Sequence, residues 1–101
     1  MKETFGEYIH SLRCQNEMTL TRLADILGVD QSTLSKIENN KRKFSIKLLP
    51  KLADCFNLNV TELEKELLSE EIALLTYNKK EVTGILKLAE EKAILYKKYK
   101  N

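Results

Sequence analysis

The 101 residues include 43% hydrophobic and 32% charged side chains, and the formal net charge is +2. This apolar content supports a packed core and excludes a disordered chain. Only three glycines and one proline are present, which excludes collagen-like, linker-like and turn-rich sandwich proteins. No apolar run approaches the ~18 residues that a membrane helix needs. The first residues contain no apolar stretch of the signal-peptide kind, so we expect a cytoplasmic protein.

Two short amphipathic helices are expected at the beginning of the chain. Apolar residues at helical spacing predict one helix over residues 4–16 and another over residues 20–27. Thr19 stands where the second helix would begin, and its hydroxyl can accept a free backbone N–H there. Gly28 stands just after this helix, where a left-handed helix end favours glycine. Both ends of the second helix are therefore marked in the sequence.

A third helix is predicted over residues 31–39, with Asp30 as its N-cap. Its only large apolar residues are Leu34 and Ile37, so most of its surface is polar. Such a helix is marginal alone, but a broad polar face is what reading of DNA bases requires. Asn39-Asn40 ends the helix, because asparagine tolerates the left-handed conformation.

Three further helices complete an all-α chain. A fourth helix is expected within residues 45–57, and Pro50 indicates that its first turn is distorted if it starts at the earlier bound. Thr61, with a glutamate three residues later, has the pattern of a capping box, which predicts a fifth helix from about residue 62. After a break, the last and longest helix is expected over residues 80–99.

The segment Thr19–Asn39 resembles the lambda-repressor-like, Xre-type helix-turn-helix family of phage repressors, Cro proteins and restriction–modification controllers. The matching pieces are Leu23-Ala24, Gly28-Val29, Gln31, Leu34-Ser35 and Ile37-Glu38. The resemblance covers about residues 5–67. It implies a five-helix DNA-binding domain, which we place at residues 1–67, followed by a C-terminal helical extension at residues 68–101.

This resemblance also implies which residues read DNA. The helix beginning at Gln31 would lie in the major groove, with its first residues on base edges. Gln31, Ser32 and Lys36 match the base-contacting positions of the family, and Ser35 shares their helix face. Glutamine can pair with adenine, lysine can donate to guanine, and serine can serve either base.

Positive charge is concentrated beside this helix. Between Lys36 and Lys51 there are six cationic side chains and one anionic side chain. Such a cluster can neutralise phosphates, so double-stranded DNA is the expected partner. The candidate phosphate-contacting residues are Thr19, Thr33, Asn39, Lys41, Arg42 and Lys43.

The resemblance further implies a partly buried ion pair between Arg13 and Glu38, which would link the first and third helices. Three residues depart from the family pattern. Leu20 replaces a glutamine that contacts phosphate and braces the first base-reading glutamine. Asn40 replaces a common glycine, which its backbone preference permits. Asp30 places a carboxylate near the phosphates, which weakens binding unless the carboxylate points away or is used in capping.

Residues typical of catalysis or metal binding are few. The single histidine, His10, is far in sequence from any acid or base partner, and no glycine-rich phosphate loop exists. We therefore expect no enzyme activity, no cofactor and no small-molecule ligand. Cys14 and Cys55 form no CxxC motif and are expected to be reduced. His10 and Cys14 share a helix face, but zinc needs three or four ligands, so we expect no metal site.

The last helix carries an apolar stripe that is too broad for an isolated surface helix. We expect it to form a homodimer interface, because the family generally reads two-fold operators as dimers. The interface residues would be Val82, Ile85, Leu86, Ala89, Ala93 and Tyr96. Packing of this helix onto its own DNA-binding domain is the structural alternative.

Two functions fit this pattern. The first is a dimeric transcription regulator, either a repressor or a controller of a restriction–modification operon. The second is an antitoxin-type module whose C-terminal helices cover a partner protein, with DNA binding secondary. A stable dimer of the purified chain favours the first function, and a tail that orders only with a second protein favours the second.

Overall fold

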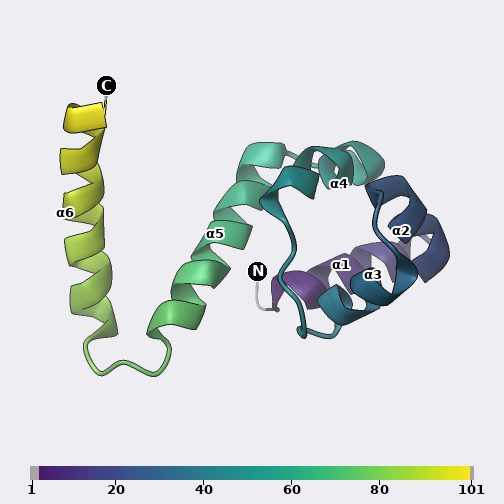
Figure 1. Cartoon of the computed structure of the whole chain (residues 1–101), viewed down its shortest axis with the longest axis horizontal. Helices are drawn as coiled ribbons and strands as arrows, with labels where there is room; N and C mark the ends of the chain where they lie inside the picture. The colour runs from purple at the N-terminus through teal and green to yellow at the C-terminus, as the bar shows by residue number, and fades with distance from the viewer. Residues whose placement is uncertain (1–2, 101) are drawn as a thin grey trace. The chain divides into compact units, whose positions relative to one another are not determined.

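The computed structural model of the chain describes residues 3–100, and every regular element in that range is helical (Figure 1). The helices in chain order are α1 (Phe5–Gln15), α2 (Leu20–Leu27), α3 (Gln31–Glu38), the 3₁₀ helix η1 (Ile46–Leu48), α4 (Leu49–Phe56), α5 (Val60–Thr76) and α6 (Val82–Lys100). The prediction of an all-α chain is confirmed.

Side chains from two parts of the chain close the N-terminus of α1. Thr4 Oγ1 accepts the N–H of Glu7 at 3.1 Å, and the Glu7 carboxylate accepts the N–H of Thr4 at 2.9 Å, which is a capping box. Glu70, on α5, accepts the N–H of Phe5 at 2.8 Å. The Glu70 contact joins the beginning of α1 to a helix that lies 65 residues further along the chain.

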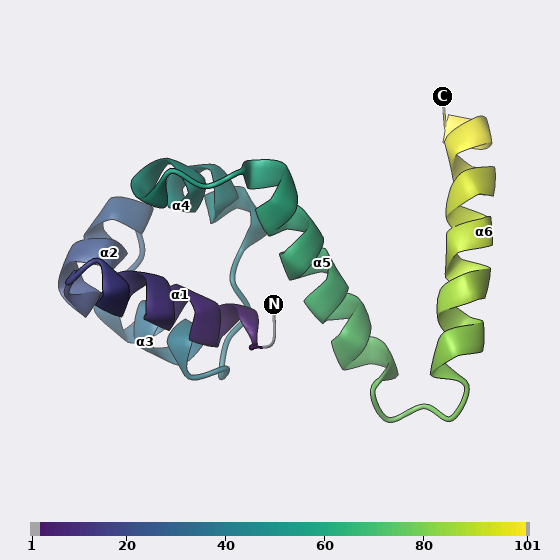
Figure 2. The ribbon, with the colours of Figure 1, turned by 180° about the vertical axis from the view of Figure 1, so that it is seen from behind.

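α1 packs closely against α3 (Figure 2). A Cβ atom at Gly6 would lie 2.1 Å from the carbonyl oxygen of Ile37, so only glycine allows this approach. At the same end, Thr4 Oγ1 donates a hydrogen bond of 2.6 Å to Asn40 Oδ1. α1 therefore supports the end of α3 that is opposite to its N-cap.

The turn between α2 and α3 follows the caps expected from the sequence. Thr19 Oγ1 accepts the N–H of Arg22 at 3.1 Å, which confirms Thr19 as the N-cap of α2. Gly28 has φ 75°, a left-handed conformation that favours glycine. Asp30 Oδ1 accepts the N–H of Thr33 and begins α3. α2 and α3 contact each other and form a helix-turn-helix.

The expected distortion at the beginning of the fourth helix is present as η1, which precedes α4. Pro50 lies in the first turn of α4. Backbone N–H groups there have no partner within the helix, so proline, which lacks an N–H, costs no hydrogen bond. Two asparagines in the left-handed conformation bound this region, Asn40 with φ 62° and Asn57 with φ 54°. The predicted use of Asn40 in place of glycine is therefore confirmed.

α5 begins two residues earlier than its sequence pattern predicts. Asn59 Oδ1 accepts the N–H of Glu62 at 3.0 Å, and the helix starts at Val60. The prediction that Thr61 is the N-cap is wrong, because Thr61 already lies inside the helix. Asparagine is as good an N-cap as threonine or better, so the earlier cap lengthens the helix by two residues.

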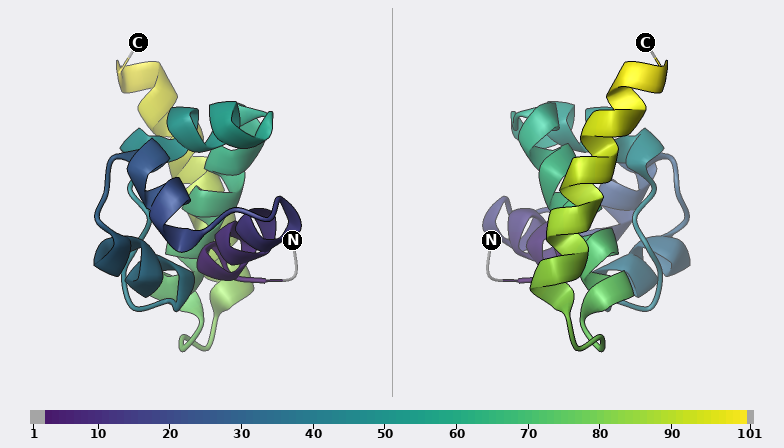
Figure 3. Two further views of the ribbon diagram at one scale, coloured as in Figure 1. Left: turned by 90° about the vertical axis from the view of Figure 1, so that its right-hand side faces the viewer. Right: turned by 90° about the vertical axis from the view of Figure 1, so that its left-hand side faces the viewer.

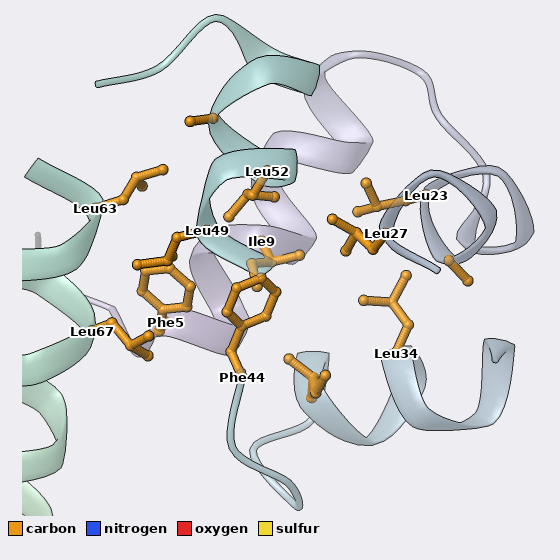
Figure 4. Close-up of a cluster of buried hydrophobic side chains, with 13 residues drawn as sticks. Phe5, Ile9, Leu23, Leu27, Leu34, Phe44, Leu49, Leu52, Leu63 and Leu67 are labelled. Carbon is orange, nitrogen blue, oxygen red and sulfur yellow. The ribbon is translucent and has the colours of Figure 1, made fainter. Parts of the chain in front are cut away.

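The core is built from α1 to α4, the segment before α4, and the first half of α5 (Figure 4). Phe5 and Phe44 stack in a tilted arrangement with ring centroids 5.3 Å apart. The other buried apolar residues are Ile9, Leu23, Ala24, Leu27, Leu34, Ile37, Leu49, Leu52, Ala53, Leu63 and Leu67. Because Leu63 and Leu67 belong to this core, the first part of α5 is included in the domain that carries the helix-turn-helix.

The chain divides into two compact units, which meet between Glu70 and Glu71. The second unit contains the end of α5, a turn and α6, which is one uninterrupted helix (Figure 3). No residue of α6 is buried, and its apolar side chains include Leu86 at 42% exposure and Tyr96 at 62%. Leu67 and Leu68, between which we placed the domain boundary, both lie inside α5. No helix within residues 3–100 is long and apolar enough to cross a membrane.

Candidate nucleic-acid interface

α3 has one buried side and one polar side. Leu34 and Ile37 are buried in the core, and Leu34 points into it (Figure 4). Gln31, Ser32 and Lys36, which are three of the four predicted base-contacting residues, are exposed. The fourth, Ser35, and the predicted phosphate contact Thr33 are half-buried. The structure thus brings the base-reading candidates together on one short helix that is anchored by two apolar residues.

The carboxylate of Asp30 is used in capping. Its Oδ1 accepts the N–H of Thr33 at 2.6 Å, and this hydrogen bond is the main reason that the pKa of Asp30 lies below its usual value. Arg42 and Lys36 are close enough to lower this pKa further. Asp30 therefore stays ionised and compensates the free N–H groups at the beginning of α3.

Cationic side chains lie near both ends of α3. Lys41, Arg42 and Lys43 are exposed in the segment that follows the helix. Lys51, on α4, adds a cation beside the turn between α2 and α3, because a Cβ atom at Gly28 would lie 3.3 Å from Lys51 Nζ. Lys51 was not among the predicted phosphate-contacting residues, although it belongs to the charge cluster seen in the sequence.

Two polar phosphate candidates are partly engaged within the protein. The Thr19 hydroxyl accepts the N–H of Arg22, and its side chain is exposed at the beginning of α2. Asn39 Nδ2 donates to the carbonyl oxygen of Ser35 at 2.8 Å, so one of its donors is already used. Asn39 is exposed.

Leu20 has a packing role at the position where the family usually has glutamine. It is half-buried and packs against the core at the first turn of α2. Together with Ser35 and Asn39 it also lines a hollow of about 440 Å³ beside α1 and α3. Arg13 lines the same hollow.

Arg13 and Glu38 form a two-pronged ion pair between α1 and α3. Arg13 Nε lies 2.8 Å from Glu38 Oε2, and Arg13 Nη2 lies 2.9 Å from Glu38 Oε1. Arg13 Nη1 also donates to the carbonyl oxygen of Met18 at 3.0 Å, which ties the loop before α2 to the pair. The Glu38 side chain is only 5% exposed and that of Arg13 14% exposed. This geometry holds α3 by its last turn.

His10 is a third member of this cluster, which the sequence analysis did not predict. Its Nδ1 lies 2.8 Å from Glu38 Oε1, so a residue that is distant in sequence is an acidic partner of His10 in the fold. The partner was missed because it is 28 residues away, although His10 and Arg13 lie on one face of α1. Burial raises the pKa of Glu38, but the hydrogen bonds from Arg13 and His10 outweigh this effect and the net pKa is lowered.

The two cysteines are free, with Cys14 exposed and Cys55 half-buried. Among residues 3–100, no three or more histidine, cysteine or acidic side chains are grouped in a way that suits a metal ion. The surface around α3 instead presents polar and cationic side chains. Such a surface suits a polyanion, DNA, whose phosphates attract cations and whose base edges offer hydrogen-bond donors and acceptors.

Comparison with known proteins decides the family. A family model described as helix-turn-helix matches residues 9–63, which is more than half of the chain. The chain belongs to this family. The lambda-repressor-like, Xre-type resemblance is confirmed, and so is the general prediction that this helix-turn-helix protein is a DNA-binding transcription regulator.

Solved structures support the same fold. SinR, the master regulator for biofilm formation, in complex with DNA, is 33% identical, with a TM-score of 0.50 over 55% of this chain and 90% of that one. A SinR–SinI complex is 25% identical, with a TM-score of 0.52 over 92% and 99%. A hypothetical protein from E. coli, 20% identical, gives 0.65 over 92% and 99% and shows the fold alone. No curated protein matches the chain.

Proposed function

We propose that this helix-turn-helix protein is a sequence-specific transcription regulator that reads a two-fold DNA operator as a homodimer. The single observation that carries this proposal is the exposed polar face of α3. The opposite side of this helix is fixed by the buried residues Leu34 and Ile37, and its last turn by the ion pair between Arg13 and Glu38. SinR, which is 33% identical, has been solved in complex with DNA, and this likeness supports the proposal.

In this proposal, α3 lies in the major groove with its N-terminal half on base edges. Gln31 pairs with an adenine, Lys36 donates to a guanine, and Ser32 serves either base. Ser35 is half-buried, so its side chain would reach less far toward the bases than the side chains of Gln31, Ser32 and Lys36. Because the helix is fixed by its apolar side and its last turn, these side chains are positioned before DNA arrives.

The phosphates on either side of the groove are neutralised by the cations around α3. Lys41, Arg42 and Lys43 are exposed and would release counterions on binding. Thr19, Thr33 and Asn39 would add hydrogen bonds from α2 and α3 that fix the position of the protein on the duplex. These contacts supply affinity for any sequence, and the face of α3 supplies the preference for one sequence.

Dimerisation would use the apolar stripe of α6. Ile85 and Leu86 are 40% and 42% exposed, and Tyr96 is 62% exposed, so the stripe is available to a second copy. The remaining members, Val82, Ala89 and Ala93, continue the stripe at helical spacing. Two copies joined in this way would place two α3 helices on one operator.

Selection of binding sites from a random duplex library with the full chain tests this proposal. We expect enrichment of an inverted repeat whose half-site centres are about 10 base pairs, or a multiple of that, apart. Enrichment of a single unrepeated site would contradict the dimer, and no enrichment at all would contradict sequence-specific binding. The identity of the adjacent genes then separates a repressor from a restriction–modification controller.

A second function is favoured by the exposed stripe itself and by the SinR–SinI complex. That complex aligns with 92% of this chain at 25% identity, so the alignment includes α6 or part of it, and one of its components is a second protein. The helices after the DNA-binding domain would then bind a partner of another kind, as in an antitoxin. Native mass spectrometry of the chain purified alone decides: a stable dimer supports the regulator, and a monomer that pairs only with a co-expressed protein supports this second function.

A further inference from the structure

The side chain of Asp30 lies at the tip of α3, directly before the base-reading candidate Gln31. It is exposed, and it is ionised because its pKa lies below the usual value. A negative charge at this place repels the phosphates of DNA, which lowers the affinity for every sequence. Tight binding therefore requires that other groups, or a contact with DNA itself, offset this repulsion.

Capping leaves part of the Asp30 carboxylate available. Oδ1 accepts the N–H of Thr33 at 2.6 Å, and the side chain of Thr33 also hydrogen-bonds the carboxylate. An ionised carboxylate has about four acceptor positions on its two oxygens. Thr33 does not fill all of them, and because Asp30 is exposed the others are open to a donor outside the protein. The contacts with Thr33 also hold the side chain in place, so little conformational freedom is lost when a donor binds.

Two cations reduce the repulsion between this carboxylate and DNA. Lys36 and Arg42 are near enough to Asp30 to lower its pKa, and both side chains are exposed. Both are also candidate DNA contacts, so positive charge lies near Asp30 on the surface where the DNA would bind. The tip of α3 can therefore enter the major groove with its carboxylate ionised.

The four bases offer different groups to a carboxylate in the major groove. Cytosine presents the N4 amino group, which donates a hydrogen bond, whereas guanine presents O6 and N7 and thymine presents O4, which only accept. Adenine presents a donor at N6 beside an acceptor at N7. Because an ionised carboxylate only accepts hydrogen bonds, it binds cytosine best and is repelled by guanine and thymine.

We propose that Asp30 is a specificity-determining residue, which accepts a hydrogen bond from N4 of a cytosine in each half-site of the operator. This inference rests on the proposed function, in which α3 enters the major groove with its first residues on base edges. Consecutive Cα atoms are about 3.8 Å apart, which is close to the rise of about 3.4 Å per base, so Asp30 and Gln31 contact the same or neighbouring base pairs. Asp30 thereby rejects guanine and thymine, which the contact of Gln31 with adenine does not do at this position.

Asp30→Asn tests this contact with almost no change in the size of the side chain. Asparagine caps helices about as well as aspartate does, so α3 should still begin at Gln31. The amide oxygen must accept the N–H of Thr33, which leaves the amide nitrogen, a donor, facing the groove. Because guanine and thymine present acceptors there, we expect the variant to exchange the preference for cytosine for a preference for one of these two bases.

Site selection from a random duplex library with the full chain locates the cytosine, and fluorescence anisotropy on defined duplexes measures the preference. We expect the parent to bind about tenfold more weakly when guanine replaces this cytosine in both half-sites, which is the size of a lost hydrogen bond to a charged group. Asp30→Asn should bind the guanine duplex at least as tightly as the cytosine duplex. Equal discrimination between the two duplexes by the parent and by Asp30→Asn would overturn the proposal.

Two further variants separate base reading from charge and from capping. Asp54→Asn removes one negative charge at an exposed position of α4 and should leave the preference at every position unaltered. Asp30→Ser keeps the cap but removes the carboxylate, so the preference for cytosine should be lost and no strong new preference should appear. If both Asp30 variants bind every sequence more tightly with unchanged preferences, Asp30 contributes only general repulsion and the proposal fails.

Gln31→Ala, taken through the same selection, distinguishes failure of this inference from failure of the proposed function. If the parent enriches a two-fold site in which Gln31→Ala relaxes one position, but both Asp30 variants keep the preferences of the parent, the inference about Asp30 alone is wrong. If the parent enriches no sequence, the proposed function is wrong and the inference with it. Circular dichroism melts of both Asp30 variants should stay close to that of the parent, because asparagine and serine are both good N-caps.

Discussion

Glu38 is nearly buried and accepts hydrogen bonds from Arg13 Nε, Arg13 Nη2 and His10 Nδ1. Removing Arg13 with an alanine leaves an uncompensated carboxylate beside the core. We expect this change to lower the free energy of unfolding by about 3 kcal/mol, at the lower end of the range for buried pairs because water reaches His10. Urea melts followed by circular dichroism measure this loss.

The double variant Arg13→Met with Glu38→Leu is the control for this prediction. Replacing both partners by apolar side chains removes the unpaired charge, so much of the lost stability should return. The coupling energy from the four melts should be about 1 kcal/mol or more. Strictly additive losses would show that Arg13 and Glu38 do not interact in solution.

The lowered pKa of Glu38 makes part of the stability depend on pH. Because the folded-state pKa is below the unfolded-state value, this contribution is fully present above the unfolded pKa and is lost as the pH falls through the folded one. Glu38→Gln resembles the protonated side chain. We expect the difference in Tm between parent and Glu38→Gln to be largest near neutral pH and to shrink below about pH 4. A difference that stays constant down to the acid end would contradict this account.

At this scale, prediction from the sequence succeeded where a local rule or a family pattern applied. Thr19 and Asp30 cap helices through side chains that accept an N–H three residues later, and Gly28 ends α2 through its own backbone conformation, so all three act locally. Arg13 and Glu38 came from the family resemblance, because nothing in their spacing indicates contact. His10 and Glu70 were missed for the same reason: their partners are 28 and 65 residues away, and only the packing of helices brings them close.

Among the elements, α5 provides a direct test of which residue caps a helix. Asn59 accepts the N–H of Glu62, whereas Thr61 lies inside the helix. Asn59→Ala should lower the free energy of unfolding by roughly 1 kcal/mol, within the usual range for a lost N-cap. Thr61→Ala is the matched control and should be neutral or slightly stabilising, since alanine is the better helix former. A larger loss of unfolding free energy in Thr61→Ala than in Asn59→Ala would instead identify Thr61 as the cap.

The order and kind of the helices could be predicted because each is amphipathic and most have marked ends. The start of α5 was misplaced because both Asn59 and Thr61 can cap a helix. Asn59 accepts the free N–H of Glu62, so the helix begins two residues earlier than a cap at Thr61 would allow. The break before α6 was predicted correctly. The apolar stripe of α6 is exposed, and the spacing of its residues does not identify the surface that binds it. The exposed polar face of α3 could be predicted because only two large apolar residues, Leu34 and Ile37, interrupt its polar residues.

For the molecule as a whole, the proposed homodimer depends on the apolar stripe of α6. Leu86→Glu places a charge in the middle of the proposed interface, where it would lack a partner. We expect a folded monomer in sedimentation experiments, with an unchanged melt of the DNA-binding domain and weaker binding to a two-fold site. Association of the parent in the same experiment is required by the proposal.

Lys98→Glu is the control for this change, because residue 98 lies on the opposite side of α6 from the stripe. It alters the charge of the same helix and should leave the parent assembly intact. If Leu86→Glu lowers the stability of the chain without altering its mass, α6 packs onto its own chain. A parent that is monomeric at high micromolar concentration would contradict the dimer.

The central claim is that α3 reads DNA bases, and Gln31→Ala tests it most directly. Fluorescence anisotropy gives the affinity of the parent and of Gln31→Ala for the selected operator and for a duplex of scrambled sequence. We expect Gln31→Ala to lose about 1–3 kcal/mol of binding free energy on the operator, or roughly 5- to 150-fold in affinity, and almost nothing on the scrambled duplex. An equal loss on both duplexes, or no loss on the operator, would contradict the claim that Gln31 reads sequence.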